Sequence, residues 1–197
     1  MKRALLVHAQ LTFRDMRAGH VPQRSAEEAP STLAAPISPS PDLVVDAGLP
    51  LLDLDAGSFL VDLGCGDGRW LVAAASRVPG CRGLGVDVDP ARLAAAEAAI
   101  RDRGLEDRVE VRRRDAFACA REDPEVAAAD AVVVYLFRAA AEEIGPVLRR
   151  RLQAGEGTRT RTRPARVLSV GFALPGWGAP VREARVGGLR VYLYATQ

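Results

Sequence analysis

Short apolar runs alternate with stretches of helix-like spacing along the chain from about residue 43 onward. The apolar runs are bounded by glycine, proline or charged residues and have the length of buried strands. They predict five strands, at residues 59–63, 83–88, 109–113, 131–137 and 166–173. The stretches between them place apolar residues three or four positions apart, which is typical of helices packed on one face. They predict helices at residues 43–54, 68–78, 90–103 and 142–152.

The carboxyl-terminal part of the chain has a different pattern. Two strand-like segments, residues 183–186 and 189–195, flank Gly187-Gly188, and a two-residue glycine turn is typical of a β-hairpin. Strands that alternate with helices form parallel sheets, because each helix carries the chain back across the sheet. We therefore expect an α/β fold with a mainly parallel seven-stranded sheet and a carboxyl-terminal antiparallel hairpin.

The first 41 residues differ in composition from the rest of the chain. Four prolines lie between residues 29 and 41, where they remove amide donors and prevent long helices or strands. Positions 1–26 hold five Lys and Arg residues and a single acidic residue, which resembles a mitochondrial transit peptide. An ordinary basic tail has the same composition. We expect a flexible segment at 1–41, a folded domain at 42–197, and a mitochondrial location in a eukaryote, with the cytoplasm as the alternative.

Composition narrows the class of protein. Hydrophobic residues make up 48% of the 197 positions and charged residues 26%, which is ordinary for a globular domain and excludes a wholly disordered chain. No apolar run approaches the ~18 residues of a membrane-spanning helix, so we expect no integral membrane segment. The three cysteines are far apart and form no CxxC pair, so we expect no metal site. A net charge of only +2 does not by itself imply a nucleic-acid partner, and we expect a monomer.

The most informative segment is the glycine-rich loop after the first predicted strand, in the sequence FLVDLGCGDGRW of residues 59–70. Glycine allows a sharp turn and lets a ligand approach the backbone, and the helix that follows offers free N–H groups. The alternating glycines are Gly64, Gly66 and Gly68. A dinucleotide fingerprint has the spacing GxGxxG, but here Arg69 stands in place of the third glycine. The preceding Asp62 would repel a pyrophosphate and suits a positively charged ligand, so S-adenosylmethionine is favoured over NAD.

Two further acidic residues lie at the carboxyl end of the second predicted strand and just after the third. Asp87 is placed to accept hydrogen bonds from both hydroxyls of a ribose, with Asp89 as the second choice. Asp115 is placed to accept from an adenine amino group. Because parallel strands end at one edge of a sheet, we expect Asp62, Asp87 and Asp115 to converge there. For any one of them alone, a turn residue or a helix cap is the alternative interpretation.

Three motifs, DLGCGDG, GVDVD and RRRDAF, together resemble the cofactor motifs of class I S-adenosylmethionine-dependent methyltransferases. The resemblance spans residues 39–195 and implies a Rossmann-like methyltransferase fold with S-adenosyl-L-methionine as the cofactor. It implies that Asp87 binds the ribose and that Asp115 contacts the adenine. It also implies contacts around the methionine moiety from Asp62, Gly64, Gly66 and Asp67.

Three shorter segments are similar to a narrower group, the lysine methyltransferases that act on the ATP synthase c subunit and the adenine nucleotide translocase, with their bacterial relatives. The segments are SPSP at residues 38–41, Val134-Tyr135-Leu136, and Gly176-Trp177. This resemblance implies transfer of methyl groups to a lysine side chain of a protein. The chain departs from the family pattern at Ser40, where threonine is usual, and at Phe137-Arg138, where Leu-Pro is often found. It also has a longer insertion at 155–164.

Within that resemblance, Tyr135 is the candidate catalytic residue. It stands at the tip of the fourth predicted strand, where its phenol can orient a lysine amine and its ring can face the cation. Pro41 and Trp177 are candidates for the walls of the substrate channel. The alternatives are that Tyr135 is a core aromatic residue and that Trp177 only packs. A lysine made neutral by burial needs no strong base, so the absence of histidine from residues 42–197 is no objection.

Two other kinds of acceptor stay open. Seven arginines lie between residues 149 and 166, and such a cluster can contact phosphates, which would indicate an RNA methyltransferase. A solvated helix end followed by a flexible loop has the same charge pattern. A small-molecule methyltransferase is the other alternative, although the short proline-rich lead before the glycine-rich loop offers no obvious cap over the site.

Overall fold

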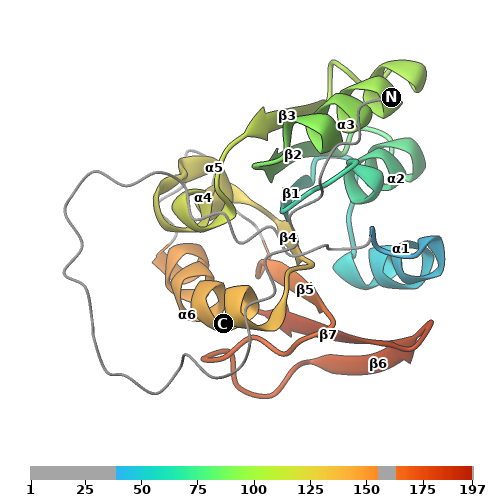
Figure 1. Ribbon diagram of the computed structural model, residues 1–197. Helices are drawn as coiled ribbons and strands as arrows, with labels where there is room; N and C mark the ends of the chain where they lie inside the picture. Colours follow the sequence, from blue (N-terminus) through green and yellow to red (C-terminus); the bar gives the residue numbers. More distant parts are fainter. Residues whose placement is uncertain (1–38, 155–162, 197) are drawn as a thin grey trace, which may run out of the picture. The chain divides into compact units, whose positions relative to one another are not determined.

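The computed structural model describes residues 39–154 and 163–196 of the chain (Figure 1). Its centre is a seven-stranded sheet with the strand order β3-β2-β1-β4-β5-β7-β6. The strands are β1 (Phe59–Leu63), β2 (Arg82–Asp87), β3 (Val109–Arg113), β4 (Ala131–Val134), β5 (Arg166–Val170), β6 (Arg182–Val186) and β7 (Leu189–Ala195). Strands β1 to β5 are parallel, and β7 runs antiparallel to both β5 and β6. The predicted fold class, with its mainly parallel sheet and antiparallel hairpin, is confirmed.

Helices cover both faces of this sheet (Figure 1). They are α1 (Asp42–Gly48), the 3₁₀ turn η1 (Leu49–Leu52), α2 (Arg69–Arg77), α3 (Pro90–Asp102), α4 (Ala116–Glu122), α5 (Pro124–Ala128) and α6 (Arg138–Ala154). Buried side chains of α1, α2 and α3 share one core with Leu60 and Val133. Those of α4, α5 and α6 share a second core with Val61 and Val132. Because neighbouring residues of a strand point to opposite faces, β1, β4 and β5 each contribute apolar side chains to both cores.

The fourth strand and the sixth helix begin or end elsewhere than predicted. The strand predicted at 131–137 ends at Val134, which pairs with Leu63, the last residue of its partner β1. Tyr135 therefore lies in the loop just past the strand. Helix α6 begins at Arg138 rather than at residue 142, because buried alanines in its first turn belong to its apolar face. Strand β5 likewise ends at Val170 rather than at residue 173.

The helix predicted at 43–54 divides into α1 and the 3₁₀ turn η1. Pro50 has no N–H to donate, so the hydrogen-bond ladder of the regular helix is interrupted at this point. Gly48 ends α1 at a close approach, because a Cβ there would lie 2.7 Å from the Trp70 ring. The chain therefore changes from an α-helix to a 3₁₀ turn where α1 packs against α2.

The sequence did not predict the two short helices α4 and α5. Each begins at an acidic cap: the side chains of Asp115 and Asp123 accept hydrogen bonds from amides of the first helical turn. With seven and five residues, these helices are too short to show a clear apolar period. Their side chains nevertheless complete the second core.

Some predictions fall outside the described residues. These are the flexible character of segment 1–41 up to residue 38, and the structure of the insertion as far as residue 162. The transit-peptide interpretation and the cellular location stay predictions. Within the described ranges, none of the helices combines the length and the apolar character needed to cross a membrane.

Candidate functional site

The glycine-rich loop between β1 and α2 is attached to β2. The amides of Gly64 and Cys65 both donate to the carbonyl of Val86, at 2.9 Å each. Gly66 has a φ of +56°, in the left-handed region that favours glycine, and a Cβ added there would meet no atom within 4 Å. The backbone at Gly66 is therefore open to a ligand, as a cofactor-binding loop requires.

Asp87 joins this loop to the one that follows β2. Its Oδ2 accepts from the amide of Gly66 and its Oδ1 from the amide of Asp89, each at 2.9 Å. The side chain is buried, yet each carboxylate oxygen has a further lone pair with which to accept a hydrogen bond. The structure thus fixes Asp87 at the carboxyl edge of the sheet beside the open Gly66. Its contact with a ribose stays a prediction.

Two other acidic residues at this edge cap helices. Asp89 begins α3, where its Oδ1 accepts from an amide of the first turn at 2.9 Å. Asp115 begins α4, where its Oδ1 accepts from the amide of Ala118 at 2.9 Å. The amide of Arg114 donates to the carbonyl of Asp87 at 3.1 Å. Asp115, the next residue, is therefore held close to Asp87 along this edge of the sheet. The helix-cap role left open by the sequence applies to Asp115, and its contact with adenine stays a prediction.

Asp62 is the buried carboxyl group of the site. Its residue is 2% exposed, and its Oδ2 has no hydrogen-bond partner among the described residues. Burial, together with the carboxylates of Asp87 and Asp67, raises the pKa of Asp62 to about 8. Buried polar atoms are nearly always paired, so an orphaned carboxyl oxygen indicates that a ligand supplies its partner. A cation fits, because it would favour the ionised carboxylate, and S-adenosylmethionine carries an ammonium and a sulfonium group.

Arg69 donates hydrogen bonds to both carboxylate oxygens of Asp67. Nε of Arg69 lies 2.9 Å from Oδ1 and Nη2 lies 2.6 Å from Oδ2, which makes a bidentate ion pair. The hydrogen-bonded guanidinium holds the pKa of Asp67 below its ordinary value. The same guanidinium donates through Nη1 to the carbonyl of Ser40. Asp67 therefore orients the arginine that reaches the segment before α1, and its direct contact with the methionine moiety stays a prediction.

A second contact fixes the segment before α1. Trp70 Nε1 donates to Oγ of Ser40 at 3.0 Å, and both side chains are buried. Pro41 follows, exposed, and its carbonyl accepts from the amide of Val44 at 2.8 Å. Through Ser40, Pro41 is thus held next to the glycine-rich loop, and its place in a substrate channel stays a prediction. No sequence pattern predicted that Arg69 and Trp70 would make these contacts.

Tyr135 leaves the sheet beside the glycine-rich loop. Val134 pairs with Leu63, so the residues that follow, Tyr135 and Gly64, emerge from adjacent strands at the same edge. Tyr135 is half-buried, and its hydroxyl makes no hydrogen bond to another residue in the described part of the chain. The phenol is therefore available to a substrate group that reaches this edge.

An arginine lies over a phenylalanine ring at the same end of the sheet as Tyr135, on the side of the other core. A Cβ on Gly171 would lie 3.9 Å from the Tyr135 ring, so the loop after β5 passes along the tyrosine. In the next residue, Phe172, the ring centroid lies 4.7 Å from Cζ of Arg138. The only sequence signal at this pair is the departure from the family pattern at Phe137-Arg138. Nothing in the sequence indicated that the Phe172 ring would contact the Arg138 guanidinium.

Trp177 is anchored on helix α6. Its residue is 9% exposed, and Nε1 donates to the carbonyl of Gly145 at 2.9 Å. Its ring centroid lies 5.6 Å from that of Tyr194. These contacts agree with the packing interpretation of Trp177, and a role in the wall of a substrate channel stays a prediction.

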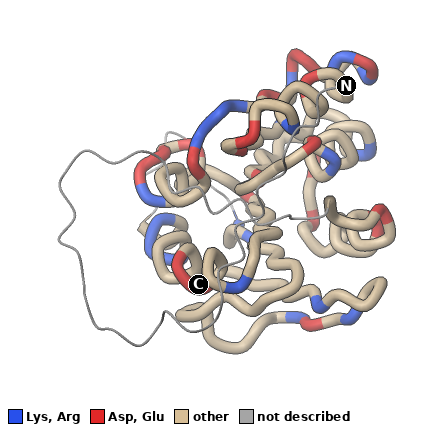
Figure 2. The backbone as a smooth tube through the Cα atoms, in the orientation of Figure 1, with Lys and Arg blue, Asp and Glu red and all other residues tan. Residues whose placement is uncertain are grey.

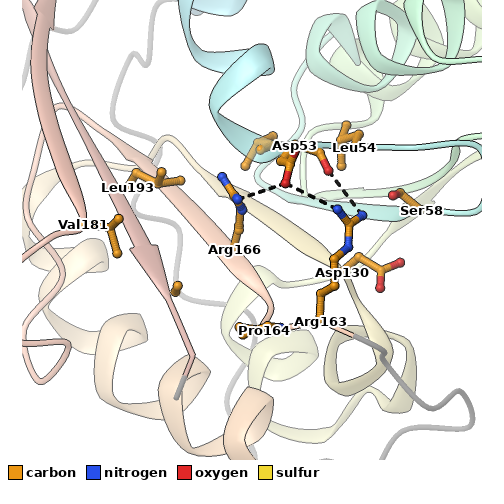
Figure 3. Close-up of a pocket in the computed structure, with 11 residues that line it drawn as sticks. Asp53, Leu54, Ser58, Asp130, Arg163, Pro164, Arg166, Val181 and Leu193 are labelled. Atoms are coloured by element: carbon orange, nitrogen blue, oxygen red, sulfur yellow. Dashed lines mark hydrogen bonds and ion pairs between the residues drawn. The ribbon is translucent and has the colours of Figure 1, made fainter.

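Two cavities lie at the opposite edge of the sheet, where the parallel strands begin. One, of about 220 Å³, is lined by residues that include Ser58, Asp130 and Arg166 (Figure 3). In it, Oδ2 of Asp53 accepts from Nη2 of Arg166 at 2.9 Å and also pairs with Arg163. The other, of about 340 Å³, lies at the start of β1, β2 and β3. Ligands of open α/β sheets bind at the carboxyl ends of the strands, so neither cavity is the cofactor site.

The described cysteines are poor nucleophiles. Cys65, Cys81 and Cys119 are all buried and unbridged. Burial raises the pKa of Cys81 to about 11 and that of Cys65 above its ordinary value, so both thiols are protonated at neutral pH. Among residues 39–154 and 163–196, no three His, Cys, Asp or Glu side chains form a group that could hold a metal ion.

Comparison with known proteins finds methyltransferases. The ANTKMT methyltransferase domain matches residues 62–181. A protein-lysine N-methyltransferase from Saccharolobus islandicus is 28% identical over 162 residues, which are 81% of this chain and 92% of that protein. A ribosomal protein L11 methyltransferase from Vibrio cholerae is 32% identical over 104 residues, which are 53% of this chain and 32% of that protein.

A solved structure is similar over most of its length. An RNA methyltransferase from Salinibacter ruber, in complex with S-adenosyl-L-homocysteine, has a TM-score of 0.67 and 32% identity, covering 80% of this chain and 93% of that one. The predicted resemblances to class I methyltransferases and to the translocase lysine methyltransferases are confirmed, and so is the cofactor. The chain belongs to the ANTKMT methyltransferase domain family of S-adenosylmethionine-dependent methyltransferases.

Proposed function

We propose that this protein transfers a methyl group from S-adenosylmethionine to the ε-amino group of a lysine in a protein substrate. The observation that carries the proposal is the position of Tyr135, which follows β4 next to Gly64 of the glycine-rich loop and whose phenol makes no hydrogen bond to another described residue. The relative from Saccharolobus islandicus, which this chain covers over 92% of its length, is a protein-lysine N-methyltransferase. That likeness supports a lysine acceptor.

The chemistry requires a neutral amine held in line with the methyl group. When bound, S-adenosylmethionine supplies a methyl group on a positively charged sulfur. The lone pair of the lysine nitrogen forms the new bond as the carbon–sulfur bond breaks, its electron pair stays on sulfur, and a proton leaves the nitrogen for water. The leaving group is good, so holding the amine in the right orientation supplies much of the rate enhancement.

The residues at this edge suit that task. A free lysine has a pKa of about 10.4, and burial beside an aromatic ring lowers it without any strong base. The Tyr135 hydroxyl can accept a hydrogen bond from the amine and orient it. Asp62 and Asp87 lie at the ends of β1 and β2, on the neighbouring strands of the same sheet edge. There they would hold the positively charged cofactor. No histidine is needed.

The Salinibacter ruber relative makes RNA the second candidate acceptor. However, four of the seven arginines between residues 149 and 166 donate to carbonyl or carboxylate oxygens of this chain itself. They are Arg149, Arg151, Arg163 and Arg166. The last two lie at the cavity on the opposite edge of the sheet (Figure 3). Figure 2 shows basic residues interspersed with acidic ones along the described chain. These observations favour a protein acceptor.

Radiolabelling can test the proposal directly. The purified protein is incubated with tritiated S-adenosylmethionine and a cell extract, and the extract is then treated with ribonuclease or with protease. We expect the label to resist ribonuclease, to be lost with protease, and to map to methylated lysine by mass spectrometry. Label in RNA or in a small metabolite would overturn the proposal. An Asp87→Ala variant, which should not bind the cofactor, gives the background.

A further inference from the structure

The positive charge of Arg138 lies at the carboxyl edge of the sheet, where the acceptor lysine is expected to bind. It begins helix α6, three positions after Tyr135, and its guanidinium lies over the Phe172 ring at 4.7 Å. Phe172 in turn follows Gly171, which lies against the tyrosine ring. The tips of β4 and β5 therefore carry Tyr135, which packs against the core shared by α1, α2 and α3, and Phe172, which packs against the core on the α6 side and holds the Arg138 cation.

The guanidinium of Arg138 is largely uncommitted. Its side chain is 71% exposed, and the nearest carboxylate, that of Glu142, lies 3.9 Å away and is itself 56% exposed. That distance is too long for a hydrogen bond. By contrast, Arg69 is held by a carboxylate and a carbonyl, and Arg149 by the carbonyl of Gly176. With respect to the described residues, most of the five N–H donors of Arg138 have no acceptor and are available to a bound group.

Helix formation does not account for a cation at this position. The first turn of a helix is the positive end of its dipole, where acidic residues are favoured and basic residues are not. Phe172 offers a ring that fixes the guanidinium plane, and a fixed guanidinium is suited to bidentate binding of a carboxylate. The arrangement therefore matches recognition of an anion beside the acceptor lysine.

We propose that Arg138 is a specificity-determining residue that binds an acidic side chain close to the target lysine of the protein substrate. This inference rests on the proposed function, because it assumes a lysine acceptor at Tyr135. The occupant is an aspartate or glutamate within a few residues of that lysine. Phe172 sets the orientation of the guanidinium.

Charge reversal on one helix gives a matched test. The Arg138→Glu variant places an acid where the helix dipole favours one, so it should fold normally. Arg150, exposed on the same helix, provides Arg150→Glu as a control with the same net charge. Both variants and the wild type are assayed with a lysine-centred peptide library whose flanking positions carry Glu, Gln or Lys.

We expect the wild type and Arg150→Glu to methylate Glu-flanked peptides with a kcat/KM about fivefold higher than Gln-flanked ones. In Arg138→Glu the preference should shift to Lys-flanked peptides, while the affinity for S-adenosylmethionine measured by calorimetry stays unchanged. Lysine methylation with the same flanking preference in all three proteins would overturn this inference alone. Absence of lysine methylation both in the library and in the labelled extract would overturn the proposed function as well.

Discussion

The indole Nε1 of Trp70 donates a hydrogen bond of 3.0 Å to the hydroxyl of Ser40, and the two side chains are buried together. Arg69, the neighbour of Trp70, holds the carbonyl of the same serine and the carboxylate of Asp67. The segment before α1 and the glycine-rich loop are therefore one hydrogen-bonded unit. The threonine usual at position 40 in the resembling family would supply the same hydroxyl.

Removal of the Ser40 hydroxyl should destabilise the protein. In Ser40→Ala the indole N–H of Trp70 is left buried without an acceptor, which typically costs about 1–3 kcal/mol of the free energy of unfolding. Urea unfolding followed by tryptophan fluorescence measures this loss. Ser40→Thr keeps the hydroxyl and should stay close to the wild type. Equal stability of Ser40→Ala and the wild type would mean that water replaces the serine.

Loss of the Asp87 carboxylate should abolish cofactor binding. In Asp87→Ala the amide of Gly66 loses its acceptor, and the group predicted to hold the ribose is gone. Titration calorimetry with S-adenosylmethionine should show no binding, while circular dichroism shows a folded protein. Asp89→Ala is the control: it removes a helix cap, should cost about 1 kcal/mol of stability, and should retain binding. Normal affinity in Asp87→Ala would remove the ribose assignment.

The sequence predicts best what depends on neighbours along the chain. The apolar runs located the five parallel strands, the glycine pair at 187–188 located the antiparallel hairpin, and the acidic residues at the ends of β1 and β2 and after β3 marked the edge predicted to bind the cofactor. Strand ends were predicted less well, because β4 stops where Leu63 of β1 stops, and that pairing is set by the fold. The contact from Arg69 to Ser40 spans 29 positions, and local patterns carry no information about such a pair.

The buried Asp62 should make stability depend on pH. Its pKa rises from an ordinary 3.8 to about 8 in the folded protein. Below pH 4 both states carry the proton, whereas between pH 4 and 8 only the unfolded chain ionises, so the free energy of unfolding falls as the pH rises. The fall is at most on the order of 6 kcal/mol. Urea unfolding without cofactor at pH 5 and pH 8 measures it.

Asp62→Asn supplies the comparison for that measurement. The amide has a similar shape but does not titrate, so the stability of this variant should change less between the two pH values. The difference between the two proteins should be small at pH 5 and should move in favour of Asp62→Asn as the pH approaches 8. Parallel pH profiles would show that Asp62 ionises normally in the folded protein.

Tyr135→Phe should separate catalysis from cofactor binding. The substitution removes the hydroxyl and leaves the ring beside Gly171, so affinity for S-adenosylmethionine should stay within a factor of about three while kcat falls about 10–100-fold, as for loss of a positioning hydrogen bond. Single-turnover methylation and calorimetry measure the two effects. Tyr194→Phe is the matched control, because that hydroxyl accepts from the amide of Leu174 inside the core. Its loss should lower stability by about 1 kcal/mol and leave kcat unchanged. Equal losses of affinity and turnover in Tyr135→Phe would make Tyr135 a structural residue.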